Sequence, residues 1–184
     1  MTSLPQKIVA IHQGLQAGGV AHAFGGALAL AWCTQRARGT IDIDLNIFVP
    51  VPEAGVALRN LPEEISVSDA DLALIVAQGQ ARLWWQTTPV DVFMSTTDHH
   101  ARVAERVRWE VFAGARVPFL GCDDLAVFKA FFGRTRDWAD LEEIAEAGTL
   151  DVDRVVGVLV RYLGATDERI PRLTALGREG AEPV

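Results

Sequence analysis

The sequence predicts a mixed α/β (α+β) fold, a sheet flanked by helices and followed by a helical annex. Segments with the alternating, β-branched pattern of strands occur only before residue 121, and segments with helical periodicity alone follow. The 184 residues are 49% hydrophobic and 22% charged, which provides enough apolar material for a core. We expect residues 1–120 to form a core and residues 121–184 an annex packed on it in one structural unit.

The strand and helix signals of the first fifty residues alternate. Residues 5–16 have apolar side chains at helical spacing and end at a glycine pair. Residues 20–24 predict a short strand, and residues 27–33, rich in Ala and Leu, predict a short helix. Residues 40–49 alternate strictly and are β-branched, so they are the clearest strand of the chain.

The later segments follow the same two patterns. The expected helices cover residues 53–61, 69–77, 99–108, 123–132, 138–147, 152–163 and 168–176. The expected strands cover residues 81–86, 90–95, 111–112 and 116–119. We expect the strand at 90–95 to lie beside the strand at 40–49.

Composition excludes several classes of protein. Seventeen Lys and Arg against 24 Asp and Glu give a net charge of −7, which argues against a protein that binds duplex DNA non-specifically. Cys33 and Cys122 are the only cysteines, so a disulfide-rich secreted scaffold and a cysteine zinc site are excluded, and we expect a reducing, cytoplasmic compartment. No long apolar window and no signal-peptide layout occur, so no membrane association is expected.

Two carboxylates stand in the strand at 40–49. Residues two apart on a strand share a face, so Asp42 and Asp44 are expected to project together, while Ile41, Ile43 and Leu45 enter the core. Adjacent carboxylates repel each other unless a cation neutralises them, and Mg²⁺ prefers carboxylate and phosphate oxygens. The pair therefore predicts a divalent metal site. The alternative is a solvated edge strand with two exposed Asp.

Further residues extend this candidate site. Gly25 and Gly26 lie between a strand and a helix, where glycine allows close approach of a ligand and the helix start favours a phosphate. The alternative is a turn-forming glycine pair. Asp91 stands inside the otherwise apolar strand at 90–95, where a lone carboxylate needs a partner or a metal. Next to Asp42 and Asp44 it becomes a third ligand; otherwise it is a solvated strand end.

Two stretches resemble a known family. Phe24-Gly25-Gly26 followed by Arg38-Gly39-Thr40-Ile41-Asp42-Ile43-Asp44-Leu45 resembles the signature of the nucleotidyltransferase superfamily, the fold of DNA polymerase beta. Residues 117–130 with residues 133–141 are similar to AbiEii-type toxin nucleotidyltransferases and their small uncharacterised relatives. The resemblance implies transfer of a nucleoside monophosphate from an NTP with two Mg²⁺ ions. The second glycine stands where many members carry Ser.

The resemblance implies a role for each matching residue. Metal binding falls to Asp42, Asp44 and Asp91, with Asp91 also a base for the acceptor hydroxyl. Nucleotide binding falls to Gly25, Gly26, Arg38, Thr40, Lys129 and Arg134, with Arg136 as an alternative to Arg134. Lys129, which needs a charged partner among apolar neighbours, is expected to reach the triphosphate, and Asp137 to act as an ion-pair partner or base. The alternatives are a surface lysine and a helix-capping Asp137.

The acceptor is left open. A tRNA or protein acceptor implies the toxin of a toxin–antitoxin pair, with an antitoxin protein as partner. An aminoglycoside or another small alcohol implies a modifying enzyme, and the acidic balance suits a cationic substrate. A catalytically silent nucleotide-binding or interaction module is the third possibility, although intact carboxylates at 42, 44 and 91 argue against it.

Overall fold

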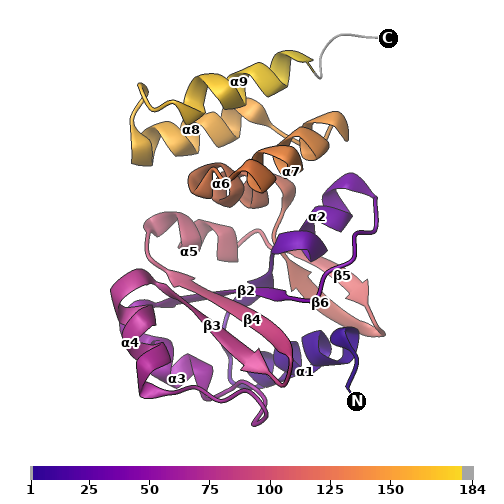
Figure 1. The fold of residues 1–184 in the computed structure, drawn as a ribbon, viewed down its shortest axis with the longest axis vertical. Helices are drawn as coiled ribbons and strands as arrows, with labels where there is room; N and C mark the ends of the chain where they lie inside the picture. Colours follow the sequence, from indigo (N-terminus) through magenta and orange to yellow (C-terminus); the bar gives the residue numbers. More distant parts are fainter. Residues whose placement is uncertain (1, 180–184) are drawn as a thin grey trace. The chain divides into compact units, whose positions relative to one another are not determined.

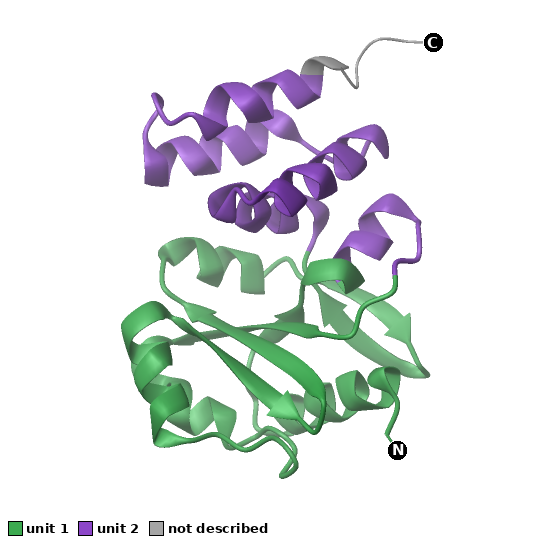
Figure 2. Cartoon of the chain, viewed as in Figure 1, with its two compact units in different colours: residues 1–28, 39–120 green, residues 29–38, 121–184 purple. Residues whose placement is uncertain are grey.

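The computed structural model describes residues 2–179, which divide into two compact units (Figure 2). The α/β unit contains the residues up to Leu28 and Gly39–Leu120. The helical unit contains Ala29–Arg38 and the described residues from Gly121 onward. The helical unit therefore contains a segment from the amino-terminal half in addition to the later helices.

A six-stranded mixed sheet forms the centre of the α/β unit (Figure 1). Its strands are β1 (His22–Phe24), β2 (Ile43–Pro50), β3 (Gln80–Trp85), β4 (Thr88–Ser95), β5 (Arg108–Phe112) and β6 (Ala115–Phe119). Their order is β3-β4-β2-β1-β6-β5. The β2–β4 and β1–β6 pairs are parallel, and the other neighbours are antiparallel. The expected adjacency of the strands at 40–49 and 90–95 is confirmed.

Helices supply the remaining core of this unit. They are α1 (Leu4–Ala17), α3 (Ala54–Leu58), α4 (Asp69–Gln78) and α5 (Asp98–Ala104), with a 3₁₀ turn, η1 (Val51–Glu53). Ile8, Ile11 and Leu15 of α1 are fully buried because their spacing places them on one face of the helix. Ser68 caps α4 by accepting the backbone N–H of Asp71, as its position in the sequence predicts.

The helical unit has its own core. It contains most of α2 (Gly26–Thr34), which starts in the α/β unit, and α6 (Cys122–Phe132), α7 (Thr135–Glu146), α8 (Val152–Leu163) and α9 (Arg169–Glu179). Trp138, Leu141, Val155, Leu159 and Leu173 are buried together at its centre. Within residues 2–179, no helix is long and apolar enough to cross a membrane.

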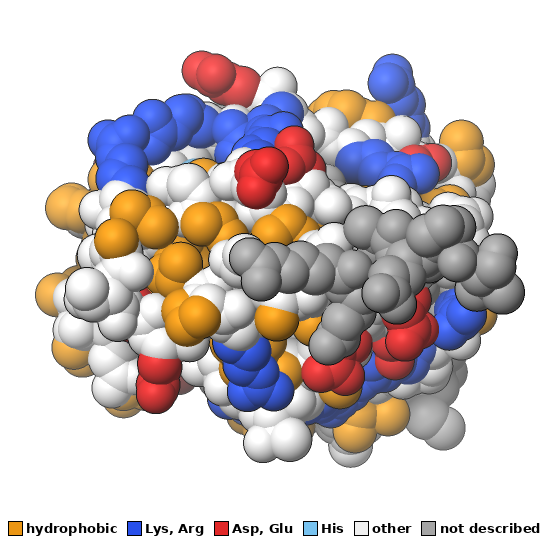
Figure 3. Space-filling view, turned by 90° about the horizontal axis from the view of Figure 1, so that it is seen from above, with side chains coloured by type: hydrophobic (Ala, Val, Ile, Leu, Met, Phe, Trp, Pro, Cys, Tyr) orange, Lys and Arg blue, Asp and Glu red, His pale blue; other side chains and the backbone are white. Residues whose placement is uncertain are grey.

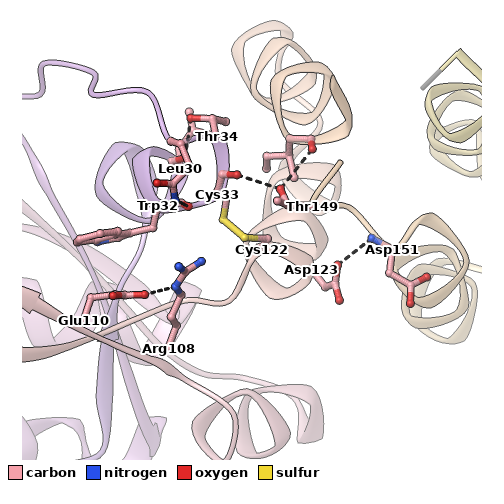
Figure 4. The surroundings of a disulfide bond; sticks show 12 residues. Leu30, Trp32, Cys33, Thr34, Arg108, Glu110, Cys122, Asp123, Thr149 and Asp151 are labelled. Atoms are coloured by element: carbon pink, nitrogen blue, oxygen red, sulfur yellow. Dashed lines mark hydrogen bonds and ion pairs between the residues drawn. A yellow bond between two sulfur atoms is a disulfide. The ribbon is translucent and has the colours of Figure 1, made fainter. Parts of the chain in front are cut away.

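A disulfide between Cys33 and Cys122 joins the end of α2 to the start of α6 (Figure 4). Beside it, the Thr149 hydroxyl donates to the carbonyl of Cys33 at 3.1 Å. The bond lies wholly within the helical unit, in which residues 29–38 group with the later helices. The cysteine count favours a reducing compartment and excludes a disulfide-rich scaffold, but it does not predict this single bond, because 89 residues separate the two positions and only the fold brings them together.

The first acidic strand is shorter than its sequence predicts. Residues 41 and 42 form a bend, and β2 begins at Ile43. The expectation that Ile41 enters the core is wrong, since its side chain is 80% exposed. The Thr40 hydroxyl accepts the backbone N–H of Asp42 at 3.3 Å, and such a local bond competes with strand pairing. The helices expected at 53–61 and 99–108 are likewise shorter, ending at Leu58 and Ala104.

Candidate functional site

Two carboxylates face each other across neighbouring parallel strands. Asp44 of β2 is the register partner of Asp91 of β4, and parallel strands lie about 4.8 Å apart. Leu45 and Val92, one position along each strand, are fully buried in the core. Because side chains alternate along a strand, Asp44 and Asp91 share the opposite face of the sheet. Both are partly exposed there.

The glycine pair approaches Asp44 closely. The backbone N–H of Gly25 donates to the carbonyl of Asp44 at 2.9 Å. Gly26, with φ +52°, starts α2, and a Cβ placed on it would lie 1.8 Å from Asp44 Oδ2. A larger residue at this position would therefore displace the carboxylate, and only glycine adopts this backbone freely. The positive end of α2 thus lies beside a carboxylate of the sheet.

Asp42 lies just before β2 and has a partner of its own. The Thr40 hydroxyl donates a hydrogen bond to the Asp42 carboxylate. Thr40, which the resemblance assigns to nucleotide binding, thus orients a carboxylate in this structure. Asp42 and Asp44 are two residues apart, as the strand pattern requires, but Asp42 is outside the hydrogen-bonded ladder.

Arg82, on the neighbouring strand β3, forms a two-point ion pair with Asp91. Its Nε lies 2.7 Å from Asp91 Oδ1, and its Nη2 lies 2.7 Å from Asp91 Oδ2. Arg82 and Asp91 are direct register partners in the β3–β4 hairpin. No sequence motif singles out this arginine. The alternation within residues 81–86 predicts which face of the sheet Arg82 lies on, but only the register of the hairpin shows that its partner is Asp91.

The structure leaves the metal role of the three aspartates as a prediction. In the part of the chain that is described, no group of three or more His, Cys, Asp or Glu side chains is placed to hold a metal ion. Instead, Asp42 is bonded to Thr40, and both oxygens of Asp91 are bonded to Arg82. The donor set itself fits Mg²⁺, which takes carboxylate oxygens and few protein ligands.

Lys129 and Arg38 form a buried ion-pair cluster with Asp140 in the helical unit. Lys129 Nζ lies 2.5 Å from Asp140 Oδ2, and Arg38 Nη1 lies 2.5 Å from Asp140 Oδ1. Burial raises the pKa of Asp140, but its bonds to Lys129 and Arg38 outweigh this and lower the pKa below its usual value. The expected charged partner of Lys129 is therefore Asp140, and the alternative of a surface lysine is wrong because Lys129 is 9% exposed.

Asp137 and Arg134 lie at the start of α7. Arg134 is the residue before the helix, and Asp137 accepts its backbone N–H at 3.1 Å and its side-chain Nε at 2.7 Å. Asp137 therefore supports the helix start from the third helical position and is not itself the N-cap residue. Lys129 Nζ is 3.8 Å from Asp137 Oδ1, and Arg136 is exposed. The roles of these residues in a reaction stay predictions.

Comparisons with known proteins give matches in structure alone. No protein-family model matches the chain, and no curated protein matches it in sequence. A crystal structure of an antigenic nucleotidyltransferase-like protein from Paracoccidioides brasiliensis is similar over 97% of this chain and 94% of its own, with 14% identity and a TM-score of 0.48.

A second similar structure is the solution structure of the antibiotic-resistance factor ANT(2'')-Ia. The similarity covers 95% of this chain and 91% of that one, with 16% identity and a TM-score of 0.48. Because both identities are below 25% and both TM-scores are below 0.5, the function of this chain has to be inferred from its own residues.

Proposed function

We propose that the chain is a Mg²⁺-dependent nucleotidyltransferase that moves a nucleoside monophosphate from an NTP to a hydroxyl acceptor. The observation that carries the proposal is the register pairing of Asp44 with Asp91 next to the Gly25-Gly26 start of α2. This arrangement places oxygen ligands for a cation beside a backbone suited to phosphate. Each part alone is common in proteins, and their juxtaposition on one sheet face is what favours nucleotide chemistry.

The glycine pair is proposed to hold the triphosphate. Neither Gly25 nor Gly26 carries a side chain that would keep a phosphate away from the backbone, and α2 begins at Gly26. The first backbone N–H groups of a helix have no partner within the helix and attract anions. The predicted phosphate ligands also include Arg38, Lys129 and Arg134. Each of them pairs with a carboxylate in the helical unit.

The proposed metal ligands are Asp42, Asp44 and Asp91. When bound, two Mg²⁺ ions would neutralise phosphate charge and orient the reacting groups. The residues of the chain then have distinct tasks. Asp44, which lies against Gly26, provides a carboxylate beside the start of α2. Asp91 takes the proton of the acceptor hydroxyl while the acceptor oxygen bonds to the α-phosphorus and pyrophosphate leaves.

The acceptor class remains to be chosen by experiment. A tRNA or protein acceptor corresponds to a cytoplasmic toxin of the AbiEii type with an antitoxin partner. A cationic small alcohol such as an aminoglycoside fits the net charge of −7. On the face seen in Figure 3, Lys and Arg are interspersed with acidic and apolar side chains, so the described residues of that face do not form a continuous basic surface for a nucleic-acid backbone.

Labelled NTPs test the proposal directly. The protein is incubated with each α-labelled NTP and Mg²⁺, together with total RNA, a protein extract or a panel of small alcohols including aminoglycosides. We expect label to move to one acceptor class, and D44N and D91N to reduce transfer at least a hundredfold. D98N is the matched control, because Asp98 lies in the same unit and is paired with Arg102 at the start of α5.

A silent nucleotide-binding module would give a different pattern. It would show a rise in melting temperature with NTP and Mg²⁺ that D44N and D91N abolish, but no transfer to any acceptor. Absence of both transfer and stabilisation would contradict the proposed function.

A further inference from the structure

The ion pair between Arg82 and Asp91 occupies the third predicted metal ligand. Both oxygens of Asp91 accept hydrogen bonds from the guanidinium, at 2.7 Å each. This is the two-point geometry in which arginine binds carboxylates most specifically. The bound carboxylate keeps lone pairs, but they point away from the centre of the fork that the guanidinium fills. A cation approaching Asp91 from that side meets a positive charge.

The charges of Asp42 and Asp44 also act on Arg82. The pKa of Arg82 is raised above its usual value, first by its hydrogen bonds to Asp91 and the charge of Asp91, and further by the charges of Asp42 and Asp44. Neighbouring carboxylates repel one another unless a positive charge lies near them. The guanidinium is a direct counter-charge for Asp91, and its charge also interacts with Asp42 and Asp44.

The two partners differ in mobility. The Arg82 side chain is 53% exposed and the Asp91 side chain 20% exposed. Arg82 lies on β3, an edge strand of the sheet, so its long side chain can swing into solvent without moving the backbone. Asp91 lies on β4, between β3 and β2, and cannot move in this way.

We propose that Arg82 is a built-in competitor for the divalent cation, releasing Asp91 when the metal binds and so setting the metal affinity of the site. The inference rests on the proposed function, because it takes Asp91 as a metal ligand. Arg82 would be a positioning residue. It keeps Asp91 oriented before the metal arrives, and it gives way to the stronger charge of the cation.

Metal titration without nucleotide tests this role. Mn²⁺, a spectroscopically visible substitute for Mg²⁺, is titrated into the full chain and free Mn²⁺ is measured by electron paramagnetic resonance. We expect R82Q to bind Mn²⁺ about two- to fivefold more tightly than the unmodified protein, the factor that an exposed ion pair contributes. R82K, whose ammonium cannot form the two-point contact, should show an intermediate affinity.

Two further variants separate the position of the charge from its mere loss. R108Q removes one positive charge from the same unit, where Arg108 pairs with Glu110 on β5, and should leave Mn²⁺ affinity unchanged. D91N should weaken Mn²⁺ binding, and adding R82Q to D91N should bring no further gain. Circular dichroism and the melting temperature confirm that each variant is folded.

The outcomes are distinct. Unchanged or weaker Mn²⁺ binding by folded R82Q and R82K, with binding retained by the unmodified protein, overturns the inference and leaves the proposed function standing. An equal gain in R82Q and R108Q also overturns it, because the effect would then be one of net charge. If neither the unmodified protein nor R82Q binds Mn²⁺, the proposed function fails and the inference fails with it.

Discussion

Replacing Gly26 with Ala probes the closest contact of the candidate site. The added Cβ would lie 1.8 Å from Asp44 Oδ2 and 2.5 Å from Asp44 Cγ, far inside contact distance. The obstructing atoms belong to the end of a side chain, so Asp44 is expected to rotate away and leave the backbone in place. The substitution is therefore a way to displace one carboxylate from the sheet face without changing its charge.

The expected loss in the free energy of unfolding caused by G26A has two parts. An L-residue in the left-handed backbone conformation of Gly26, φ +52°, costs about 1 kcal/mol. Displacing Asp44 from its position adds an off-rotamer or lost-contact cost of about 1 kcal/mol. Gly19 separates the two, because its φ is +66° and no atom lies within 4 Å of a Cβ placed there. We expect G19A to lower the free energy of unfolding by about 1 kcal/mol and G26A to lower it by about 2 kcal/mol.

Urea unfolding followed by circular dichroism measures both values. In a double-mutant cycle with D44A, which removes the two closest atoms, the cost of G26A should fall to that of G19A, a coupling of about 1 kcal/mol. G26A should also weaken the stabilisation by NTP and Mg²⁺, whereas G19A should not. Equal costs for G26A and G19A, together with no coupling to D44A, would refute the placement of Asp44 against the glycine.

Three more predictions concern the rest of the chain. K129M should lower the free energy of unfolding by about 3 kcal/mol in urea titrations, because it leaves the buried Asp140 with one cation; an unaltered midpoint would contradict this. Burial lowers the pKa of His22 to about 4, so its contribution to stability is complete above pH 6.5 and is lost as the pH falls toward 4. That loss amounts to about 3 kcal/mol in unfolding experiments across this range, and H22Q should flatten the curve; a parallel curve would exclude His22 as its source. Reducing the disulfide Cys33–Cys122 should lower the melting temperature, since the closed loop of 89 residues corresponds to about 4.6 kcal/mol of chain entropy; C33A/C122A should then be insensitive to reductant.

The fold could be predicted largely from local patterns. Alternation at 40–49 and 90–95 predicts two strands with one apolar face, and the structure pairs them as β2 and β4. The helices after residue 120 have apolar stripes at regular spacing, and they form a unit with its own core. These features depend on neighbouring residues of the sequence, which explains why a single sequence is sufficient to predict them.

The partners of the charged residues could not be predicted in the same way. Arg82 meets Asp91 through the register of a hairpin, and Lys129 meets Asp140 through the packing of α6 on α7. The bond between Cys33 and Cys122 depends on an approach over 89 residues. The prediction that Ile41 is buried is wrong for a local reason. Hydrogen bonding between Thr40 and Asp42 bends the chain before the strand begins, and the alternation of residue types does not reveal this bond.

The three predicted ligands differ in what holds them, and this difference orders their part in metal binding. Asp42 is held by a neutral hydroxyl, Asp44 lies against fixed backbone, and Asp91 is held by a charged guanidinium. Exchanging a hydroxyl for a cation requires little rearrangement. Asp91 must lose a two-point ion pair before it gains a metal, so a barrier to assembling a three-carboxylate site is expected in the contact with Arg82. Asp42 and Asp44 should accordingly bind a first cation weakly, and Asp91 should join when the attraction of the bound cations for its carboxylate exceeds that of the guanidinium.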